Sequence, residues 1–244
     1  WPTDFRFEID DFTTLLPPDT ELLDGVHYLI VEATDAFGQA GREAIVFGLD
    51  RLAPQPNPPI VVPAYDRGPS NSDGVTNISQ PFVRATANLG ERVDWYVDGK
   101  FLATQTHSEL AHLEIQLPEL LEDPHAVTIV VTDVAGNVSA MSPPLNLLVD
   151  ETPISNETFV LGLSEDSDTQ VKHDNRTVLS VVDLVGSTEP GAVVSLAGGT
   201  FTAEADDSGE VLLVSVPLEI GVNELRWNVV DLAGNVSTFS TSIT

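Results

Sequence analysis

The residues best suited to chemistry in this chain are oxygen-bearing side chains in a turn phrase that occurs three times. The phrase is Thr-Asp-Ala-Phe-Gly-Gln from residue 34, Thr-Asp-Val-Ala-Gly-Asn from residue 132 and Val-Asp-Leu-Ala-Gly-Asn from residue 230. Calcium takes about six to eight oxygen ligands from carboxylates, amides, backbone carbonyls and water. Asp133 with Asn137, and Asp231 with Asn235, offer such oxygens. The same residues suit a tight turn, because Asp and Asn bond local backbone and Gly adopts φ > 0, and both roles can hold at once.

Acidic residues also begin the two segments that would join consecutive repeats. Asp50 and Asp150 each directly follow an apolar strand pattern and precede prolines. In a sandwich of about seven alternating strands, the turn before the last strand lies at the end where the chain enters the domain. We therefore expect each turn to share a calcium ion with the linker before it. The expected ligand sets are Asp50, Asp133 and Asn137 at the first junction, and Asp150, Glu151, Asp231 and Asn235 at the second.

A second candidate cation site is the loop that spans residues 66–77. Its oxygen-bearing side chains include Asp66 and Asp73, together with Ser, Thr and Asn residues. The spacing and the closing Glu of an EF-hand are absent. The Asp166-Ser-Asp168 segment is similarly suggestive and similarly incomplete. A solvated loop without metal is the favoured alternative for both segments.

Catalytic motifs are missing from the sequence. The five histidines are scattered and show no zinc-ligand spacing, there is no Gly-x-Ser-x-Gly segment, and the absence of cysteine excludes a thiolate nucleophile. Carboxylate pairs are frequent by chance in so acidic a chain. Trp95 and Trp227 occupy apolar positions of alternating strands, which is typical of core residues rather than sugar-stacking platforms. We expect no enzymatic activity.

The turn phrase recurs at a fixed interval, and each copy follows a strand. Asp35, Asp133 and Asp231 are 98 residues apart (133 − 35 and 231 − 133). This period is too long for a solenoid repeat and suits one small domain per repeat. Apolar residues alternate before each turn, as in Val127, Ile129 and Val131, which is the pattern of a half-buried strand.

Composition limits the classes of partner. There are 38 acidic and 10 basic residues, for a net charge of −28, yet 42% of residues are hydrophobic. The chain is therefore too apolar for a disordered acidic tail, and it lacks the basic stripe that nucleic acid requires. No apolar run reaches the about 20 residues of a membrane span, and no signal peptide is evident. Because the chain starts at Trp1, we expect it to be a piece of a larger protein.

The expected domains are an incomplete repeat at 1–50 and complete repeats at 51–150 and 151–244. Both complete repeats contain several short alternating segments separated by turn signals, among them Asp98-Gly99, the strongest hairpin signal in the chain. This pattern predicts an all-β fold of tandem immunoglobulin-like antiparallel β-sandwiches. The joining segments are rich in proline, so we expect short, fairly stiff linkers.

Four sequence phrases carry a resemblance to a known family. They are Ser-Asp-Gly-Val-Thr-Asn from residue 72, Val-Asp-Gly from residue 97, Val-Thr-Asp-Val-Ala-Gly-Asn-Val-Ser from residue 131 and Val-Asp-Glu-Thr-Pro from residue 149. Together they resemble the bacterial Ig-like repeats of large secreted adhesins and biofilm-associated surface proteins. The resemblance covers the second repeat, most of the third and the back half of the first. It implies tandem stacking, with calcium at or near the junctions.

These observations lead us to expect a structural stalk segment of an extracellular bacterial adhesin, rigidified by calcium and serving adhesion or biofilm formation. Its partners would be neighbouring repeats of the same chain and, in addition, another protein chain or a surface glycan. The alternatives are a glycan- or protein-binding module and an accessory segment of a secreted hydrolase. Exposed aromatic clusters would favour binding, and the sequence offers few.

The incomplete first repeat yields a separate expectation. Residues 1–50 supply about three strands, whereas a sandwich needs about seven. One face would carry the apolar residues Phe5, Phe7, Ile9, Leu29, Val31 and Ala33. We expect strands of the same parent protein, or of another chain, to cover this face.

Overall fold

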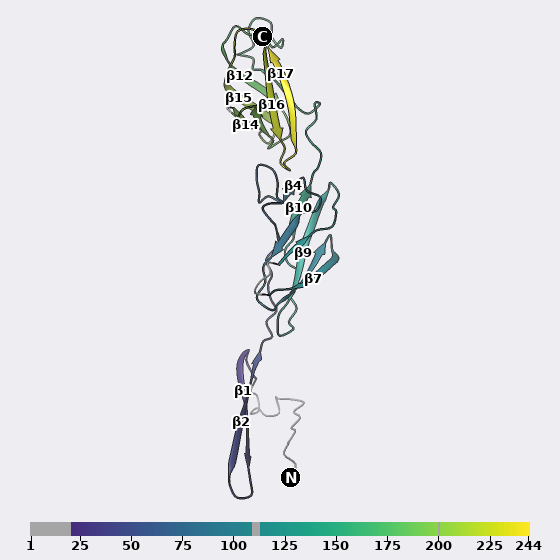
Figure 1. The fold of residues 1–244 in the computed structure, drawn as a ribbon, viewed down its shortest axis with the longest axis vertical. Coiled ribbons are helices and arrows are strands. Elements are labelled where there is room, and N and C mark those ends of the chain that lie inside the picture. The colour runs from purple at the N-terminus through teal and green to yellow at the C-terminus, as the bar shows by residue number, and fades with distance from the viewer. Residues whose placement is uncertain (1–20, 109–112, 200) are drawn as a thin grey trace.

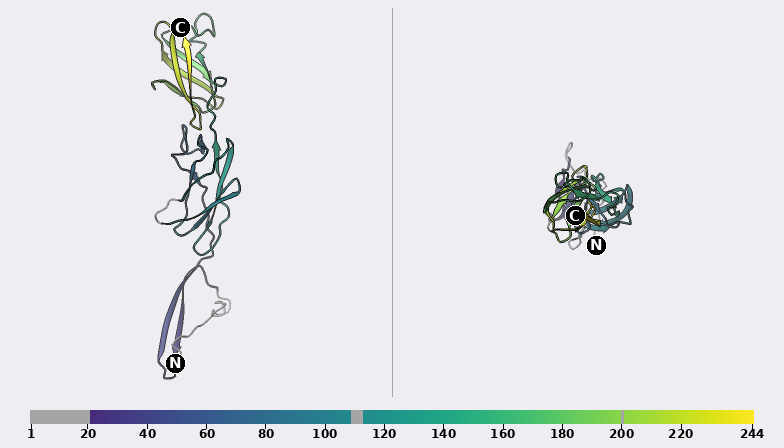
Figure 2. Two further views of the ribbon diagram at one scale, coloured as in Figure 1. Left: turned by 45° about the vertical axis from the view of Figure 1, so that its right-hand side comes forward. Right: turned by 90° about the horizontal axis from the view of Figure 1, so that it is seen from above.

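Every regular element in the described part of this chain is a β-strand. The computed structural model describes residues 21–108, 113–199 and 201–244, and no helix occurs in these ranges. The strands form three units that follow one another along the long axis (Figure 1), and a view along that axis superimposes them (Figure 2). The all-β fold class expected from the alternating sequence pattern is confirmed.

The first unit is a two-stranded antiparallel hairpin formed by β1 (Gly25–Thr34) and β2 (Ala40–Leu49). Its strands pair from Gly25 with Leu49 to Thr34 with Ala40, and the first copy of the turn phrase connects them. Adding 196, twice the repeat period, to the last pair gives Val230 with Val236, which is the last pair of the hairpin in the third unit. The two hairpins therefore share one register.

The second unit consists of two sheets that enclose one core. The larger sheet has the order β4-β10-β9-β6-β7, and the smaller has the order β3-β5-β8. Strand β4 pairs with β10 in parallel, while the other pairs are antiparallel. The strands are β3 (Ile60–Val61), β4 (Val75–Thr76), β5 (Phe82–Ala85), β6 (Arg92–Val97), β7 (Lys100–Thr106), β8 (Leu113–Gln116), β9 (Pro124–Thr132) and β10 (Leu145–Val149).

The third unit repeats this two-sheet design, with orders β11-β12-β15 and β14-β13-β16-β17. All its strand pairs are antiparallel. The strands are β11 (Val160–Leu163), β12 (Val181–Ser187), β13 (Val193–Leu196), β14 (Thr202–Glu204), β15 (Glu210–Pro217), β16 (Asn223–Val230) and β17 (Val236–Ile243).

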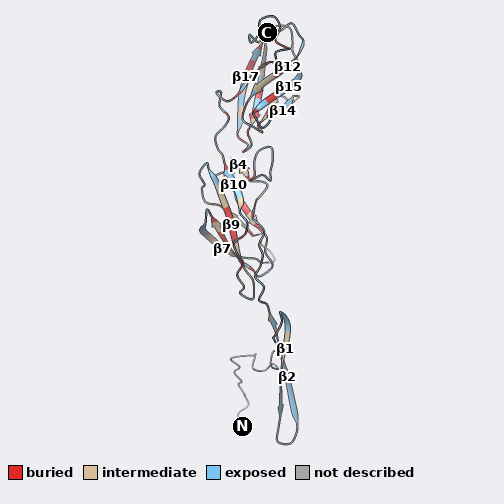
Figure 3. Cartoon of the chain, turned by 180° about the vertical axis from the view of Figure 1, so that it is seen from behind, coloured by how far each residue is buried: buried red, intermediate tan, exposed pale blue. Residues whose placement is uncertain are grey.

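Each two-sheet unit has its own core, built from the inward-facing residues of alternating strands. Trp95 on β6 and Trp227 on β16 are both completely buried. Each indole N–H has a partner, Gln105 Oε1 at 2.9 Å and Thr241 Oγ1 at 3.1 Å. Buried residues lie in β9 and in the third unit, whereas β1 and β2 are mostly exposed (Figure 3). The tryptophans are core residues, as expected.

The strand assignments from sequence are confirmed where alternation is strong and incomplete where strands are short. The segments 93–97, 126–132 and 224–230 are strands, and Asp98-Gly99 forms the β6–β7 turn. Strand β11 was not expected, and nor were the short strands β4 and β14. Two and three residues long, β4 and β14 show no periodicity of their own and exist because a neighbouring strand pairs with them.

The hairpin of the first unit presents apolar side chains to solvent. Tyr28 and Ile45 are exposed on opposite faces, and Val31 is only partly covered. Phe5, Phe7 and Ile9 lie outside the described residues. That further strands of the parent protein or of another chain cover this hairpin stays a prediction, as do the domain boundaries at 50 and 150.

We expect Trp227→Ala to destabilise the third unit by about 3–5 kcal/mol, because it leaves a large cavity between the two sheets. Trp227→Phe keeps most of the ring volume and should cost clearly less. Thermal unfolding of both variants, followed by tryptophan fluorescence, which then comes from Trp1 and Trp95 but not from the third unit, and by far-ultraviolet circular dichroism distinguishes the units. If both probes report one transition and its midpoint shifts equally in both, this prediction is wrong.

Candidate functional site

The aspartate of the turn phrase closes the turn in all three copies, with two backbone N–H bonds to its Oδ1 in the first two copies and one, from Asn235 at 2.8 Å, in the third. In the second copy, Asp133 Oδ1 accepts hydrogen bonds from the backbone N–H groups of Ala135 and Asn137, both at 2.9 Å. In the first copy, Asp35 Oδ1 accepts the corresponding bonds at 2.8 Å. Gly136 has a φ of 97°, in the left-handed region that favours glycine. The turn role expected for these residues is confirmed.

The asparagine of the phrase ties each turn to the linker before it. Asn137 Nδ2 donates to Asp133 Oδ2 at 2.9 Å and to the backbone carbonyl of Asp50 at 3.0 Å. The Nδ2 group has two N–H donors, and both are used. The side-chain amide thus spans the junction, which places the turn at the entry end of the domain, as the strand count predicts.

The second junction repeats these contacts. Asn235 Nδ2 donates to Asp231 Oδ2 and to the backbone carbonyl of Asp150, both at 2.8 Å. The expected residues Asp150, Asp231 and Asn235 are therefore brought together. Glu151 takes a different role: its backbone N–H donates to Glu122 Oε1 at 2.9 Å, and no hydrogen bond joins its side chain to the turn in the described part of the chain.

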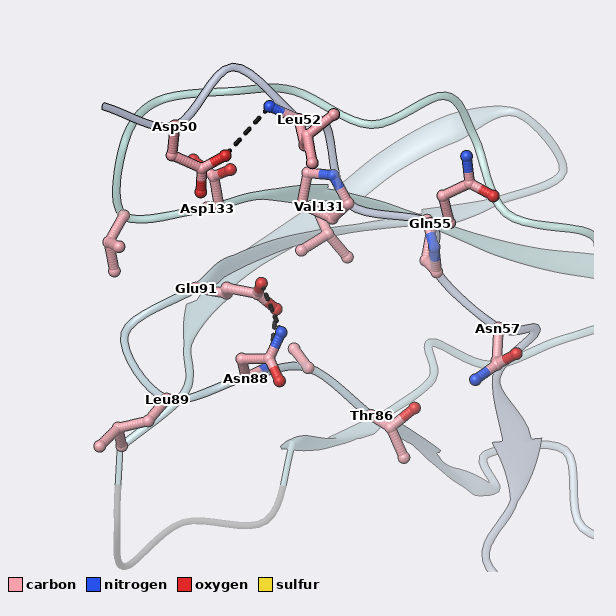
Figure 4. Close-up of a pocket in the computed structure, with 14 residues that line it drawn as sticks. Asp50, Leu52, Gln55, Asn57, Thr86, Asn88, Leu89, Glu91, Val131 and Asp133 are labelled. Carbon is pink, nitrogen blue, oxygen red and sulfur yellow. Dashed lines mark hydrogen bonds between the residues drawn. The ribbon is translucent and has the colours of Figure 1, made fainter. Parts of the chain in front are cut away.

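An open cavity of about 610 Å³ lies beside the first junction. Asp50, Glu91 and Asp133 contribute carboxylates to its lining, and Figure 4 shows Asp50 and Asp133 next to one another. Glu91 is buried and accepts hydrogen bonds from the backbone and side-chain N–H groups of Asn88 at 2.6 and 2.8 Å. The hydrogen bond from the Asn137 side chain, followed by those from backbone N–H groups, holds the pKa of Asp133 below its ordinary value.

The second junction gathers three carboxylates. Burial raises the pKa of Glu189, and the negative charges of Asp231 and Asp150 raise it further. Asp231 itself is only 1% exposed. Sequence reasoning missed Glu189, whose one available signal is its place in Ser-Thr-Glu-Pro-Gly, a turn segment that precedes a strand at the same end of the domain.

The loop 66–77 reaches across the second junction. The backbone N–H of Asn77 donates to the carbonyl of Ala233 at 3.0 Å. Gly68 packs against the turn so closely that a Cβ there would lie 2.0 Å from the carbonyl oxygen of Leu232. Ala233 is 1% exposed in consequence, whereas its counterpart Ala135 at the first junction is exposed. The expected ligands Asp66 and Asp73 both belong to this loop, the first buried and the second exposed.

The described residues contain no group of three or more His, Cys, Asp or Glu side chains arranged to hold a metal ion. A junction cation would therefore draw on backbone carbonyls and water besides carboxylates. In the described ranges no helix has the length and apolarity needed to cross a bilayer.

A family comparison decides what the second unit is. Residues 53–151 match the family model described as the bacterial Ig-like domain. These residues are a bacterial Ig-like domain. The resemblance noted in the sequence is thereby confirmed for the second unit. The match covers less than half of the chain, and no curated protein matches it.

The solved structures that are similar to this chain share little sequence with it. One is a Ca²⁺-stabilized adhesin that helps an Antarctic bacterium reach out and bind ice, with 17% identity, a TM-score of 0.33, and coverage of 90% of this chain and 56% of that one. Another comprises the fibronectin(III)-like modules of Clostridium thermocellum CbhA, with 12% identity, a TM-score of 0.43, and coverage of 69% and 85%.

A third is SGBP-B of the Bacteroides ovatus mixed-linkage glucan utilization locus, in complex with a mixed-linkage heptasaccharide. It has 16% identity, a TM-score of 0.25, and coverage of 92% of this chain and 48% of that one. The chain thus spans about half the length of the adhesin and of the glucan-locus protein. These likenesses carry no inference about function.

We expect Asn235→Ala to destabilise the third unit by about 1–3 kcal/mol, because it removes two hydrogen bonds and leaves the buried Asp231 oxygen unpaired. Asn137→Ala should cost less, since Asp133 is more accessible to water. Asn156→Ala, in an exposed turn of the third unit, is the control. Thermal melts compare the three variants, and equal effects of Asn235→Ala and Asn156→Ala would refute the role of the amide.

We expect Glu189→Gln to raise the melting temperature in chelator at neutral pH, because it removes a charge repelled by Asp231 and Asp150. The wild-type Glu189 has a raised pKa, so the folded state binds its proton more tightly. The wild-type protein therefore gains stability as the pH falls through the raised pKa of the folded state. The advantage of the variant should disappear as the pH approaches 4.5, the ordinary pKa of a glutamate. Exposed Glu157→Gln is the control, and no difference from it at neutral pH would contradict this prediction.

Proposed function

We propose that the chain is a spacer segment of an extracellular bacterial adhesin stalk, in which Ig-like units in tandem hold a distal part of the protein away from the cell. The observation that carries this proposal is the repeated junction bond. Asn137 and Asn235 each connect the tip of a hairpin to the backbone carbonyl of the linker before it. A contact repeated at the same place in successive units favours a role in spacing.

Hydrogen bonds across a junction limit bending because they fix the linker to the domain it enters. At the second junction the side chain of Asn235 donates a hydrogen bond to the linker, at the carbonyl of Asp150. The backbone N–H of Asn77, in the preceding domain, donates to the carbonyl of Ala233 in the third unit. Prolines in the linkers restrict the backbone further. These features support a stiff rather than a freely jointed chain.

Calcium at the junctions is part of the proposal. The net charge of −28 makes the units repel one another, and carboxylates gather where units meet. Asp50 with Asp133, and Asp150 with Asp231 and Glu189, would each place negative charge beside backbone carbonyls, which is the donor chemistry that calcium takes. A bound cation would cancel this repulsion and hold the linker against the turn.

The cavity at the first junction favours a second candidate function, binding of a glycan or a protein segment. None of its lining residues is aromatic, so it lacks the flat ring on which sugars stack. Trp95 and Trp227 are buried and offer no such surface either. The spacer function is therefore better supported than the binding function. The proposed spacer function requires no catalysis, and in this proposal the chain lies outside the cell.

Calcium should raise the melting temperature and increase the maximum dimension in small-angle scattering, because a ligand that binds only the folded state stabilises it. Chelator, and magnesium at matched ionic strength, serve as controls, and magnesium should substitute poorly. Asp150→Asn keeps the backbone carbonyl that Asn235 binds but removes the carboxylate, so it should reduce the calcium effect. Identical melts and dimensions with calcium and chelator would refute calcium at the junctions.

A further inference from the structure

A carboxylate in each of the first two units binds the linker that leaves that unit. Glu122 Oε1 accepts the backbone N–H of Glu151 at 2.9 Å, and its Oε2 accepts the hydroxyl of Thr152 at 2.9 Å. Asp24 lies one repeat period earlier (122 − 24 = 98) and accepts the backbone N–H of Arg51 at 3.3 Å and its Nε–H at 2.8 Å. Each junction therefore has a second contact besides the turn asparagine, which we call the linker clamp.

A histidine ring closes the loop that carries each clamp residue. His125 Nε2 lies 3.1 Å from the carbonyl oxygen of Leu121, four residues earlier in the chain. His27 Nε2 lies 2.7 Å from the carbonyl oxygen of Leu23, again four residues earlier. In both units the clamp residue directly follows the carbonyl that the ring contacts. The ring therefore helps to fix the backbone from which the clamp carboxylate projects.

The third unit keeps the loop closure without histidine and without a clamp residue. Asn223 occupies the position that matches His125, and its Nδ2 donates to the carbonyl of Glu219 at 2.9 Å. The position that matches Glu122 is Ile220, which is exposed. A neutral amide thus closes this loop, so the fold by itself does not require histidine there. Histidine occurs in the two units that clamp a following linker.

The ring of His125 has an acceptor at each of its two nitrogens. Its Nδ1 lies 2.8 Å from Asp98 Oδ2, while its Nε2 contacts the Leu121 carbonyl. A neutral imidazole has one N–H group, whereas the imidazolium has two. A carboxylate and a carbonyl oxygen only accept, so both bonds form together only when His125 is protonated. His27 has one hydrogen-bond acceptor among the described residues, which a neutral ring satisfies.

The surroundings of His125 favour its charged form. Burial lowers the pKa of His125, but the bonds to Asp98 and Leu121, followed by the charges of Asp98 and Asp123, outweigh it and raise the pKa above its ordinary value of 6.5. Strand β10, which pairs with β9 at His125, contains no charged residue between 145 and 149. The charged groups around the ring are Asp98 in the β6–β7 turn, Glu122 and Asp123 in the loop, and Lys100 on β7, which acts on Asp98.

We propose that His125, as an imidazolium, is a positioning residue that holds the Glu122 clamp closed, so that protonation stiffens the second junction and deprotonation loosens it. This regulation rests on the spacer function proposed above, in which stiffness at the junctions is what matters. The ring binds its proton more tightly when the loop is closed. The clamp is therefore stabilised below the pKa of the folded state, and this stabilisation is lost as the pH rises through that pKa. The first junction, clamped by Asp24, should not respond, because His27 needs no second proton.

Nuclear magnetic resonance of the full chain in chelator tests this proposal. The imidazole signals report the protonation of His125, and exchange of the Glu151 amide, corrected for its intrinsic rate, reports the clamp. Protection of this amide should fall as His125 loses its proton, by up to about tenfold for each pH unit between the measured pKa of His125 and 6.5. The Arg51 amide, bound by Asp24, is the internal control and should keep its protection.

Four variants identify the groups responsible. His125→Gln keeps an N–H donor but cannot titrate, so protection of the Glu151 amide should be lower and independent of pH. His27→Gln is the matched control and should leave the Glu151 profile unchanged. Glu122→Ala should remove the protection of the Glu151 amide at every pH. Asp98→Asn keeps an acceptor without the charge, so it should lower the pKa of His125 and shift the profile with it, which tests the proposal even if His125→Gln fails to fold.

Each outcome decides the proposal. Protection of the Glu151 amide that follows the titration of His125 and shifts in Asp98→Asn supports it. A pH profile that persists in His125→Gln assigns the titration to another group and overturns it, as does constant protection while His125 titrates. Unchanged protection in Glu122→Ala overturns the clamp itself. Because chelator removes calcium, a failed calcium melt would refute calcium at the junctions and leave the histidine result standing.

Discussion

The arrangement of this chain depends on one interaction, the pairing of an asparagine amide with a turn aspartate and a linker carbonyl. A hairpin tip exposes backbone N–H groups that need acceptors, and Asp133 Oδ1 supplies one. Its second oxygen orients the Asn137 amide, whose remaining N–H reaches Asp50. The turn that closes the hairpin therefore also determines where the linker lies. The same aspartate and asparagine therefore determine both the conformation of the turn and the position of the linker.

The same turn has different surroundings in the two complete units. Ala233 is buried because the loop 66–77 lies on it, while Val134, next to the corresponding Ala135, is 78% exposed. The internal contacts of both turns are otherwise alike, since Gly90 and Gly191 each pack against the residue after the turn aspartate. The burial of a turn in this architecture is thus a property of the neighbouring unit. The free energy of unfolding measured on one isolated unit would therefore differ from that of the same unit next to a neighbour.

Much of the fold follows from the sequence because its signals are local. Alternation around Trp95 and Trp227 specifies inward and outward faces, and Asp98-Gly99 specifies a turn, with no knowledge of distant partners. The junction pairs were also predictable, since the parity of antiparallel strands decides at which end a turn lies. Strand β4 and Glu189 were not, because the first is defined by pairing with β10 and the second by two carboxylates from elsewhere in the chain.

The sequence also left open which atom of each asparagine faces the junction, and this changes the chemistry. Asn137 and Asn235 present their N–H groups to carboxylate and carbonyl oxygens, so each amide already satisfies oxygens that a cation would otherwise bind. At the turns, the cost of placing carboxylates near one another is offset by these neutral donors. In the loops after the first strand no such donor reaches Asp66 Oδ1 or Asp168 Oδ1. Carboxylates that shape a turn are thus saturated by the protein, and the unsaturated ones lie in the loops.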